Sequence, residues 1–141
     1  MSTRGLYGFI EDGEYTANYN QSDSYPSGLG AEFLTACKNN DLYGFSIVED
    51  DINFIHDSLF CEWAYFYDPD NKIFEIWRGF QKVPDPENPF GQISNKNGYY
   101  PCKRIFRGHI STIDVEHLEN DDIEAFLLSK IRDEKIDKII N

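Results

Sequence analysis

The chain lacks the signatures of the common catalytic and metal-binding classes. Its 141 residues contain no phosphate-binding glycine loop, no HExxH motif and no EF-hand loop. Its three cysteines, Cys37, Cys61 and Cys102, form no CxxC pair, which excludes an encoded zinc site or disulfide framework and favours reduced thiols. We therefore expect no metal and no cofactor.

Long apolar runs are also missing. No segment approaches the roughly 18 to 20 apolar residues that span a bilayer, and the opening MSTRG lacks the apolar core of a signal peptide. The expectation is a cytoplasmic protein without membrane contact. With 40% hydrophobic and 16% aromatic residues, the chain can bury the core of one domain, residues 1–141.

Basic residues are scarce in the first half of the chain. The net charge is −12, and residues 1–71 hold 13 acids against two bases, Arg4 and Lys38. The 33 residues between Lys38 and Lys72 contain eight acids and no base. Such a segment repels nucleic-acid phosphates and attracts basic surfaces, which predicts a basic protein partner and no direct nucleic-acid binding. A soluble acidic protein without one acidic face is the simpler interpretation, and it stays open here.

Two hairpin patterns predict an α+β fold in which an antiparallel sheet of hairpins packs with helices. Residues 3–19 contain an Asp12-Gly13 turn between two β-compatible runs, and residues 61–80 contain the turn DPDN between aromatic and β-branched runs. In the second hairpin, apolar residues occupy odd and even positions alike. Both faces of the sheet are therefore expected to be covered.

The remaining elements are predicted from helical spacing and from turn residues. Residues 31–38 indicate a short helix, and residues 42–48 indicate a weak strand. Asp50 is the expected cap of a short helix with Ile52, Ile55 and Leu59 on one face. The prolines of residues 83–99 predict a long loop, which is often a functional or mobile feature.

The last third of the chain is expected to add a strand and an amphipathic helix. Residues 99–113 can form the strand, which carries the basic cluster Lys103, Arg104 and Arg107. The C-terminal amphipathic helix is expected to start at a cap on Asn120. Its apolar stripe is formed by Ile123, Leu127 and Ile131.

One enzyme class remains open as an alternative, the N-terminal nucleophile hydrolases. If Met1 is removed, the α-amine of Ser2 can act as the base for its own hydroxyl. The order of hairpin, doubly covered sheet and terminal helix loosely resembles the layered architecture of that superfamily. Arg4 and Asp23 are the side chains expected to assist Ser2. The sequence places no oriented base, so a non-enzymatic role is the first interpretation.

Two segments resemble a family of small bacterial and phage proteins. The start STRGLYGF followed by YNQSDSYPSGLG is similar to that family's Ser/Thr-Arg-Gly strand and its following Tyr-Asn, Asp-Ser-Tyr-Pro and Gly-Leu-Gly segment. The hairpin WAYFYDPDNKIFEIWRGF is similar to its central hairpin. This resemblance implies no activity and no site residues.

In general type, a small acidic protein without a catalytic motif resembles the inhibitors that phages direct against nucleic-acid-binding defence enzymes, including anti-CRISPR proteins. The resemblance implies a DNA mimic whose carboxylates occupy a basic groove while exposed aromatic residues anchor it. The predicted contacts are the acids Asp41, Glu49, Asp50, Asp51 and Asp57. The aromatic candidates, where exposed, are Tyr43, Phe45, Phe54, Trp63, Tyr65 and Trp77.

Overall fold

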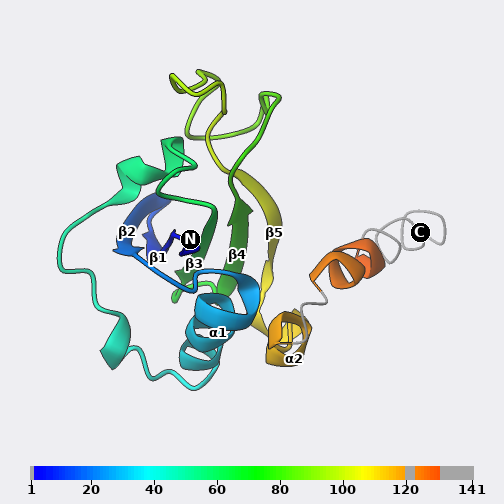
Figure 1. The fold of residues 1–141 in the computed structure, drawn as a ribbon. Helices are drawn as coiled ribbons and strands as arrows, with labels where there is room; N and C mark the ends of the chain where they lie inside the picture. Colours follow the sequence, from blue (N-terminus) through cyan, green and yellow to red (C-terminus); the bar gives the residue numbers. More distant parts are fainter. Residues whose placement is uncertain (1, 120–122, 131–141) are drawn as a thin grey trace.

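A five-stranded sheet organises the computed structural model, which describes residues 2–119 and 123–130. The spatial order of the strands is β2 (Glu14–Asn20), β1 (Gly5–Glu11), β3 (Trp63–Asp68), β4 (Ile73–Arg78) and β5 (Lys103–His109). Neighbours are antiparallel except for β1 and β3, which run parallel (Figure 1). The α+β fold expected from the sequence is confirmed, and one parallel pair joins its two halves.

Both predicted hairpins form, and local turn chemistry explains why. Asp12 and Gly13 have φ angles of 52° and 79°, and two positive φ values at the turn match the twist of the strands that it joins. In the second hairpin, the Asp68 carboxylate accepts the backbone N–H groups of Asp70 and Asn71 at 3.1 and 3.2 Å. An aspartate that closes its own turn in this way fixes the register of β3 and β4.

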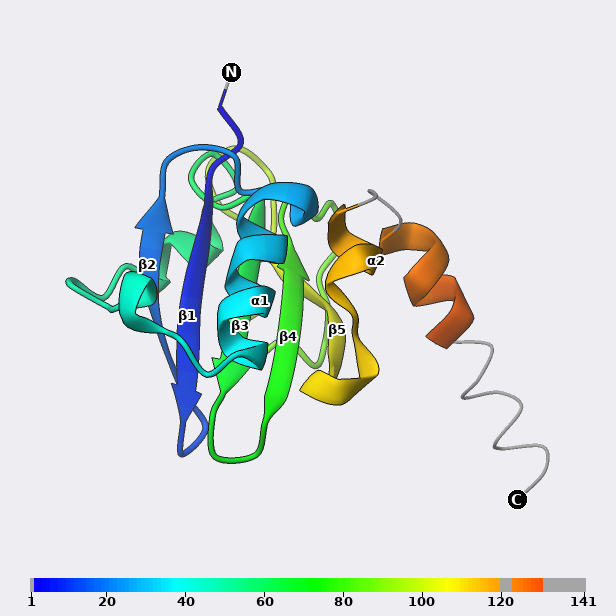
Figure 2. The same cartoon turned by 90° about the horizontal axis from the view of Figure 1, so that it is seen from below.

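Helices cover one face of the sheet (Figure 2). Helix α1 (Ala31–Lys38) has the predicted bounds and buries Phe33, Leu34 and Cys37. Helix α2 (Val115–Glu119) follows β5, and residues 123–130 are also helical, with Ile123 and Phe126 buried. The C-terminal helix is therefore present as predicted over residues 123–130, whereas its expected cap Asn120 and its stripe residue Ile131 lie outside the described residues.

The sheet has an apolar core on each face, as the second hairpin predicted. The helical side contains Tyr65, Phe74 and Ile76, which pack with α1, α2 and residues 123–130. On the other side, Phe66 and Trp77 pack beneath Ile55 and Phe90. Ile55 belongs to a 3-10 helix (Ile52–His56), and Phe90 belongs to the 83–99 loop, which has no helix or β-strand.

Two local predictions were wrong in the segment between α1 and β3. Residues 42–48 form no strand but contain a 3-10 turn (Tyr43–Phe45), and the edge of β2 is bonded instead by the Asp50 and Asp51 carboxylates and by the Asp51 N–H. Leu59 does not share the apolar face of Ile52 and Ile55. It lies beyond the end of the 3-10 helix and is 54% exposed.

The buried tyrosines predict a loss of stability at alkaline pH. Burial raises the pKa of Tyr65, and burial together with the Glu75 charge raises the pKa of Tyr15. In the unfolded chain these phenols ionise near pH 10, so above that pH the folded state binds more protons than the unfolded state. Their contribution to the unfolding free energy is complete below about pH 10 and is lost as the pH rises further.

Urea titrations between about pH 8 and pH 11 measure this effect. Tyr65→Phe is expected to flatten the alkaline decrease in unfolding free energy, whereas Tyr43→Phe, on a side chain that is 94% exposed, is expected to leave it unchanged. Equal slopes in the two variants would contradict the assignment to the buried phenols.

Candidate functional site

Residues 39–71, which contain no Lys or Arg, begin with a segment that runs outside strand β2 (Figure 1). We call this segment, residues 39–51, the arm. Its C-terminal end is tied to the strand by side chains that replace a missing neighbour strand. Asp50 Oδ1 accepts the Ala17 N–H at 3.1 Å, and Asp51 Oδ2 accepts the Tyr19 N–H at 2.9 Å. The Asp51 N–H in turn donates to Ala17 C=O at 2.8 Å. These bonds close an edge that would otherwise be open to another chain.

The middle of the arm is held by apolar side chains that pack against the core, and its other side chains are exposed to solvent. Leu42, Phe45 and Ile47 pack against the helical-side core, and the Phe45 ring contacts those of Tyr7 and Phe33 with centroids 5.1 and 5.2 Å apart. The exposed side chains of the arm include Asp41, Tyr43, Val48 and Glu49, of which Tyr43 is 94% and Val48 89% exposed. The arm therefore presents Tyr43 and Val48 together with acidic side chains on a fixed backbone.

The five predicted contact residues divide by structural role. Asp41 and Glu49 point outward from the arm, whereas Asp50 and Asp51 are engaged with the edge of β2. Asp57 is half-buried after the 3-10 helix, and its Oδ1 accepts the Leu59 N–H at 3.0 Å. Sequence reasoning missed Val48, which is apolar and carries no signal that separates an exposed position from a core position.

Most of the aromatic candidates are unsuitable as anchors. Trp63, Tyr65 and Trp77 are buried in the sheet, and Phe45 packs inward. Phe54 is half-buried and stacks on Phe60, with ring centroids 4.9 Å apart. Tyr43 is the one candidate of the six that is fully open to a partner.

No family model, curated protein or solved structure matches the chain. The resemblance to small bacterial and phage proteins therefore stays a prediction, and the site has to be argued from its own geometry.

The alternative residues Ser2 and Arg4 line one cavity of about 410 Å³ at the end of the sheet where β1 and β3 begin. In the part of the chain that the structure describes, no hydrogen bond positions a base at the Ser2 hydroxyl, which an activated nucleophile requires. The hydrolase alternative therefore stays a hypothesis that rests on the shared cavity.

Asp23 does not line that cavity. It adopts a φ of 56°, and its carbonyl accepts the Leu29 N–H at 2.8 Å. A side chain at Gly28 would place its Cβ against that same carbonyl. The next residue, Ser24, is fully buried, and its carbonyl accepts the Tyr65 hydroxyl at 2.9 Å. The YNQSDSYPSGLG stretch is thus a tightly bonded turn that leads into α1.

A buried carboxylate, that of Glu75, lies on the face of the sheet opposite helix α1, next to Trp77. It is 2% exposed, and its Oε1 accepts the Tyr15 hydroxyl at 2.8 Å and the Trp77 indole N–H at 2.9 Å. Its Oε2 lies 3.5 Å from Arg104 Nη1 and 3.4 Å from Arg107 Nε. Arg104 and Arg107, two members of the basic cluster on β5, thus offset the charge of the Glu75 carboxylate. All four partners are supplied by the protein itself.

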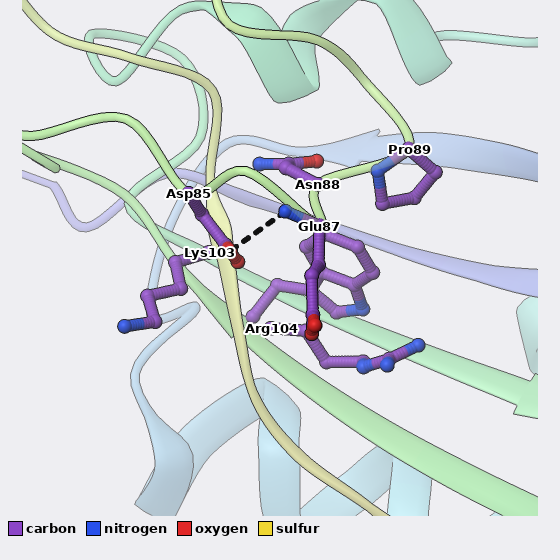
Figure 3. Close-up of a pocket in the computed structure, with 7 residues that line it drawn as sticks. Asp85, Glu87, Asn88, Pro89, Lys103 and Arg104 are labelled. Carbon is purple, nitrogen blue, oxygen red and sulfur yellow. Dashed lines mark hydrogen bonds between the residues drawn. The ribbon is translucent and has the colours of Figure 1, made fainter.

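A cleft of mixed charge lies beside this network (Figure 3). The loop contributes Asp85, Glu87 and Asn88, and β5 contributes Lys103 and Arg104. The Asp85 carboxylate accepts the Glu87 N–H at 3.1 Å, and the Asn88 amide donates to Cys102 C=O at 2.8 Å. Its charges of both signs and its internally bonded loop side chains fit a stabilising role for the long loop rather than a reaction centre.

The three cysteines are free and buried. Burial raises the pKa of Cys37 and of Cys61, so neither thiol has the electropositive setting of a nucleophile. Among residues 2–119 and 123–130, no group of three or more potential ligand side chains could hold a metal ion. Within the same residues, none of the helices has the length and apolar character needed to cross a bilayer.

Proposed function

We propose that the protein is an acidic protein-binding module that docks its arm, residues 39–51, on a basic surface of its partner. The supporting observation is the combination of outward Tyr43 and Val48 with outward Asp41 and Glu49 on a backbone held by the core. Aromatic residues that enter a partner's pocket supply most of the affinity at interfaces, and surrounding charges steer the encounter.

The partner chemistry follows from the charge distribution. Residues 39–71 carry eight acids and no base, and a segment of this charge is attracted to a cationic groove within a Debye length of about 8 Å at physiological salt. Nucleic-acid-binding enzymes carry such grooves. The proposed activity is inhibition in the cytoplasm of an enzyme of this kind, such as a nuclease of bacterial defence against phage, by occupation of its nucleic-acid groove. This is the anti-CRISPR-like, DNA-mimic hypothesis.

Asp50 and Asp51 have a supporting role in this proposal. Because their oxygens bind the backbone of β2, they fix the arm rather than meet the partner through free carboxylates. Their replacement would release the arm from β2. A weaker affinity in such a variant could then come from the altered arm conformation or from a lost contact with the partner. Asp41 and Glu49 are the cleaner positions for a test.

Binding to a panel of purified defence nucleases, measured by surface plasmon resonance, tests the proposal. Tyr43→Ala is expected to weaken binding by about 1 to 3 kcal/mol, mainly through faster dissociation, because the ring is the proposed anchor. The double variant Asp41→Asn/Glu49→Gln is expected to slow association and to reduce its salt dependence.

The controls remove the same chemistry elsewhere. Glu14→Gln/Glu116→Gln removes two exposed charges outside the arm, and Ile93→Ala removes an apolar side chain that is 87% exposed. Both are expected to bind like the wild type. Two results would count against the proposal. One is inhibition that added DNA does not relieve, and the other is an equal loss of affinity in the arm variants and the control variants.

A further inference from the structure

The cavity that contains Ser2 and Arg4 shares no lining residue with the arm. Its volume of about 410 Å³ is within the range of small-molecule sites. Its lining combines three apolar side chains, Leu59, Phe60 and Phe80, with the charged residues Arg4 and Glu62. An apolar wall with a few convergent polar groups is the usual composition of a ligand site.

The backbones of Arg4 and Glu62 are adjacent because of the parallel pairing of β1 with β3. Gly5 is the register partner of Trp63, and the Glu62 N–H donates to Arg4 C=O at 2.9 Å. The Arg4 guanidinium lies 5.5 Å from the centroid of the Phe60 ring. Neither Arg4 nor Glu62 forms an ion pair within the described part of the chain. The cavity is therefore lined by one cationic and one anionic side chain, and each can form an ion pair with a bound ligand.

This arrangement discriminates among ligands by charge. A simple carboxylate would meet the repulsion of Glu62, and a simple amine would meet that of Arg4. A ligand with both groups satisfies both side chains. Because Arg4 and Glu62 lie at adjacent strand ends and line one cavity, both side chains can reach a single small ligand that carries a carboxylate and an ammonium group.

The apolar wall contains a strained residue. Phe80 has a φ of 57°, which is unfavourable for a bulky side chain. The Ser58 hydroxyl accepts the Phe80 N–H at 2.7 Å, and the Tyr99 ring lies edge-on at 5.2 Å. These contacts hold the Phe80 ring at the cavity although the ring is 39% exposed. Backbone strain of this kind is found at ligand clamps, so it adds to the case for a ligand-binding role of the Phe80 ring.

We propose that this cavity binds a small zwitterion with an apolar side chain, of which a free apolar α-amino acid is the simplest. Its carboxylate binds Arg4, its ammonium group binds Glu62, and its side chain packs on Leu59, Phe60 and Phe80. This inference does not depend on the function proposed for the arm, and its test involves no protein partner.

The probes are L-phenylalanine, 3-phenylpropionate, which lacks the ammonium group, and phenethylamine, which lacks the carboxylate. Calorimetry is expected to show saturable binding of L-phenylalanine and binding at least about tenfold weaker for each of the other two. In the ¹⁵N–¹H spectrum, the amides of Glu62 and Phe80 are expected to shift on titration. No saturable binding of L-phenylalanine, or equal binding of a probe with one charge, overturns the proposal.

Variants separate binding from folding. Arg4→Gln and Glu62→Gln are each expected to weaken L-phenylalanine binding about tenfold or more, whereas Lys82→Gln and Glu14→Gln, both exposed and outside the cavity, leave it unchanged. Phe80→Gly removes the ring and the strain together. It is expected to weaken binding without lowering the thermal midpoint. A loss of stability in Phe80→Gly with unchanged binding would instead show that the ring serves the fold alone.

Discussion

Glu75→Ala is expected to lower the free energy of unfolding by about 3 to 5 kcal/mol, among the largest effects of any single substitution in the chain. The carboxylate is buried, and its removal leaves the Tyr15 hydroxyl and the fully buried Trp77 indole N–H without their acceptor. Each orphaned buried donor costs about 1 to 3 kcal/mol, and the space left by the side chain adds to this cost.

The arginines contribute less individually than the carboxylate. The Arg104 and Arg107 side chains are 41% and 54% exposed, so water solvates either one when its partner is removed. Arg104→Gln or Arg107→Gln alone is expected to cost about 1 kcal/mol, because the other arginine still faces Glu75. Together they leave a buried carboxylate without a cation, so the double variant is expected to cost more than the sum of the two.

Urea denaturation of these four variants and of Glu75→Gln measures the network. Glu75→Gln keeps an acceptor for Tyr15 and Trp77 and is expected to retain more stability than Glu75→Ala. A matched surface control is Glu87→Gln, at an exposed position near the network. If Glu75→Ala cost less than about 1 kcal/mol, the four contacts to this carboxylate would contribute little to the fold.

The strands and α1 could be predicted because their signals are local. The turns Asp12-Gly13 and DPDN, and the apolar spacing of residues 31–38, specify their own conformation. The arm could not be predicted in this way. Its path depends on Asp50 and Asp51 reaching the edge of β2, more than 30 residues away along the chain. A carboxylate that binds a distant backbone looks in sequence like any other surface acid.

The Glu75 network had a signal that sequence reasoning did not use. Glu75 is placed between Phe74 and Ile76 in a run predicted to be covered on both faces, so a buried acid and a cationic partner were implied. The nearest basic cluster, Lys103, Arg104 and Arg107, is on the strand that proved to be its neighbour. The cavity at Arg4 and Glu62, by contrast, depends on the parallel pairing of β1 with β3, and no local pattern encodes that pairing.

Oxidative refolding is expected to join Cys61 to Cys102. Both thiols are buried, and their Sγ atoms are 3.4 Å apart, although the residues are separated by 41 positions in the chain. In the native state the burial of both sulfurs keeps oxidants away, so the bond is expected to form while the chain folds. With oxidised glutathione as the oxidant, two exchange steps form the Cys61–Cys102 bond, break the glutathione disulfide and transfer the two thiol protons to the two molecules of reduced glutathione that leave.

The cross-link is expected to raise the unfolding free energy by about 4 kcal/mol, since it closes a loop of about 40 residues in the unfolded chain. Refolding with and without oxidised glutathione, followed by intact mass and peptide mapping, identifies the bond, and urea denaturation measures its effect. Cys61→Ala should abolish both changes, whereas Cys37→Ala should preserve them, because Cys37 belongs to α1, on the opposite face of the sheet. A disulfide that forms but leaves the unfolding free energy unchanged would mean that closing it distorts the core around β3 by as much as it restricts the unfolded chain.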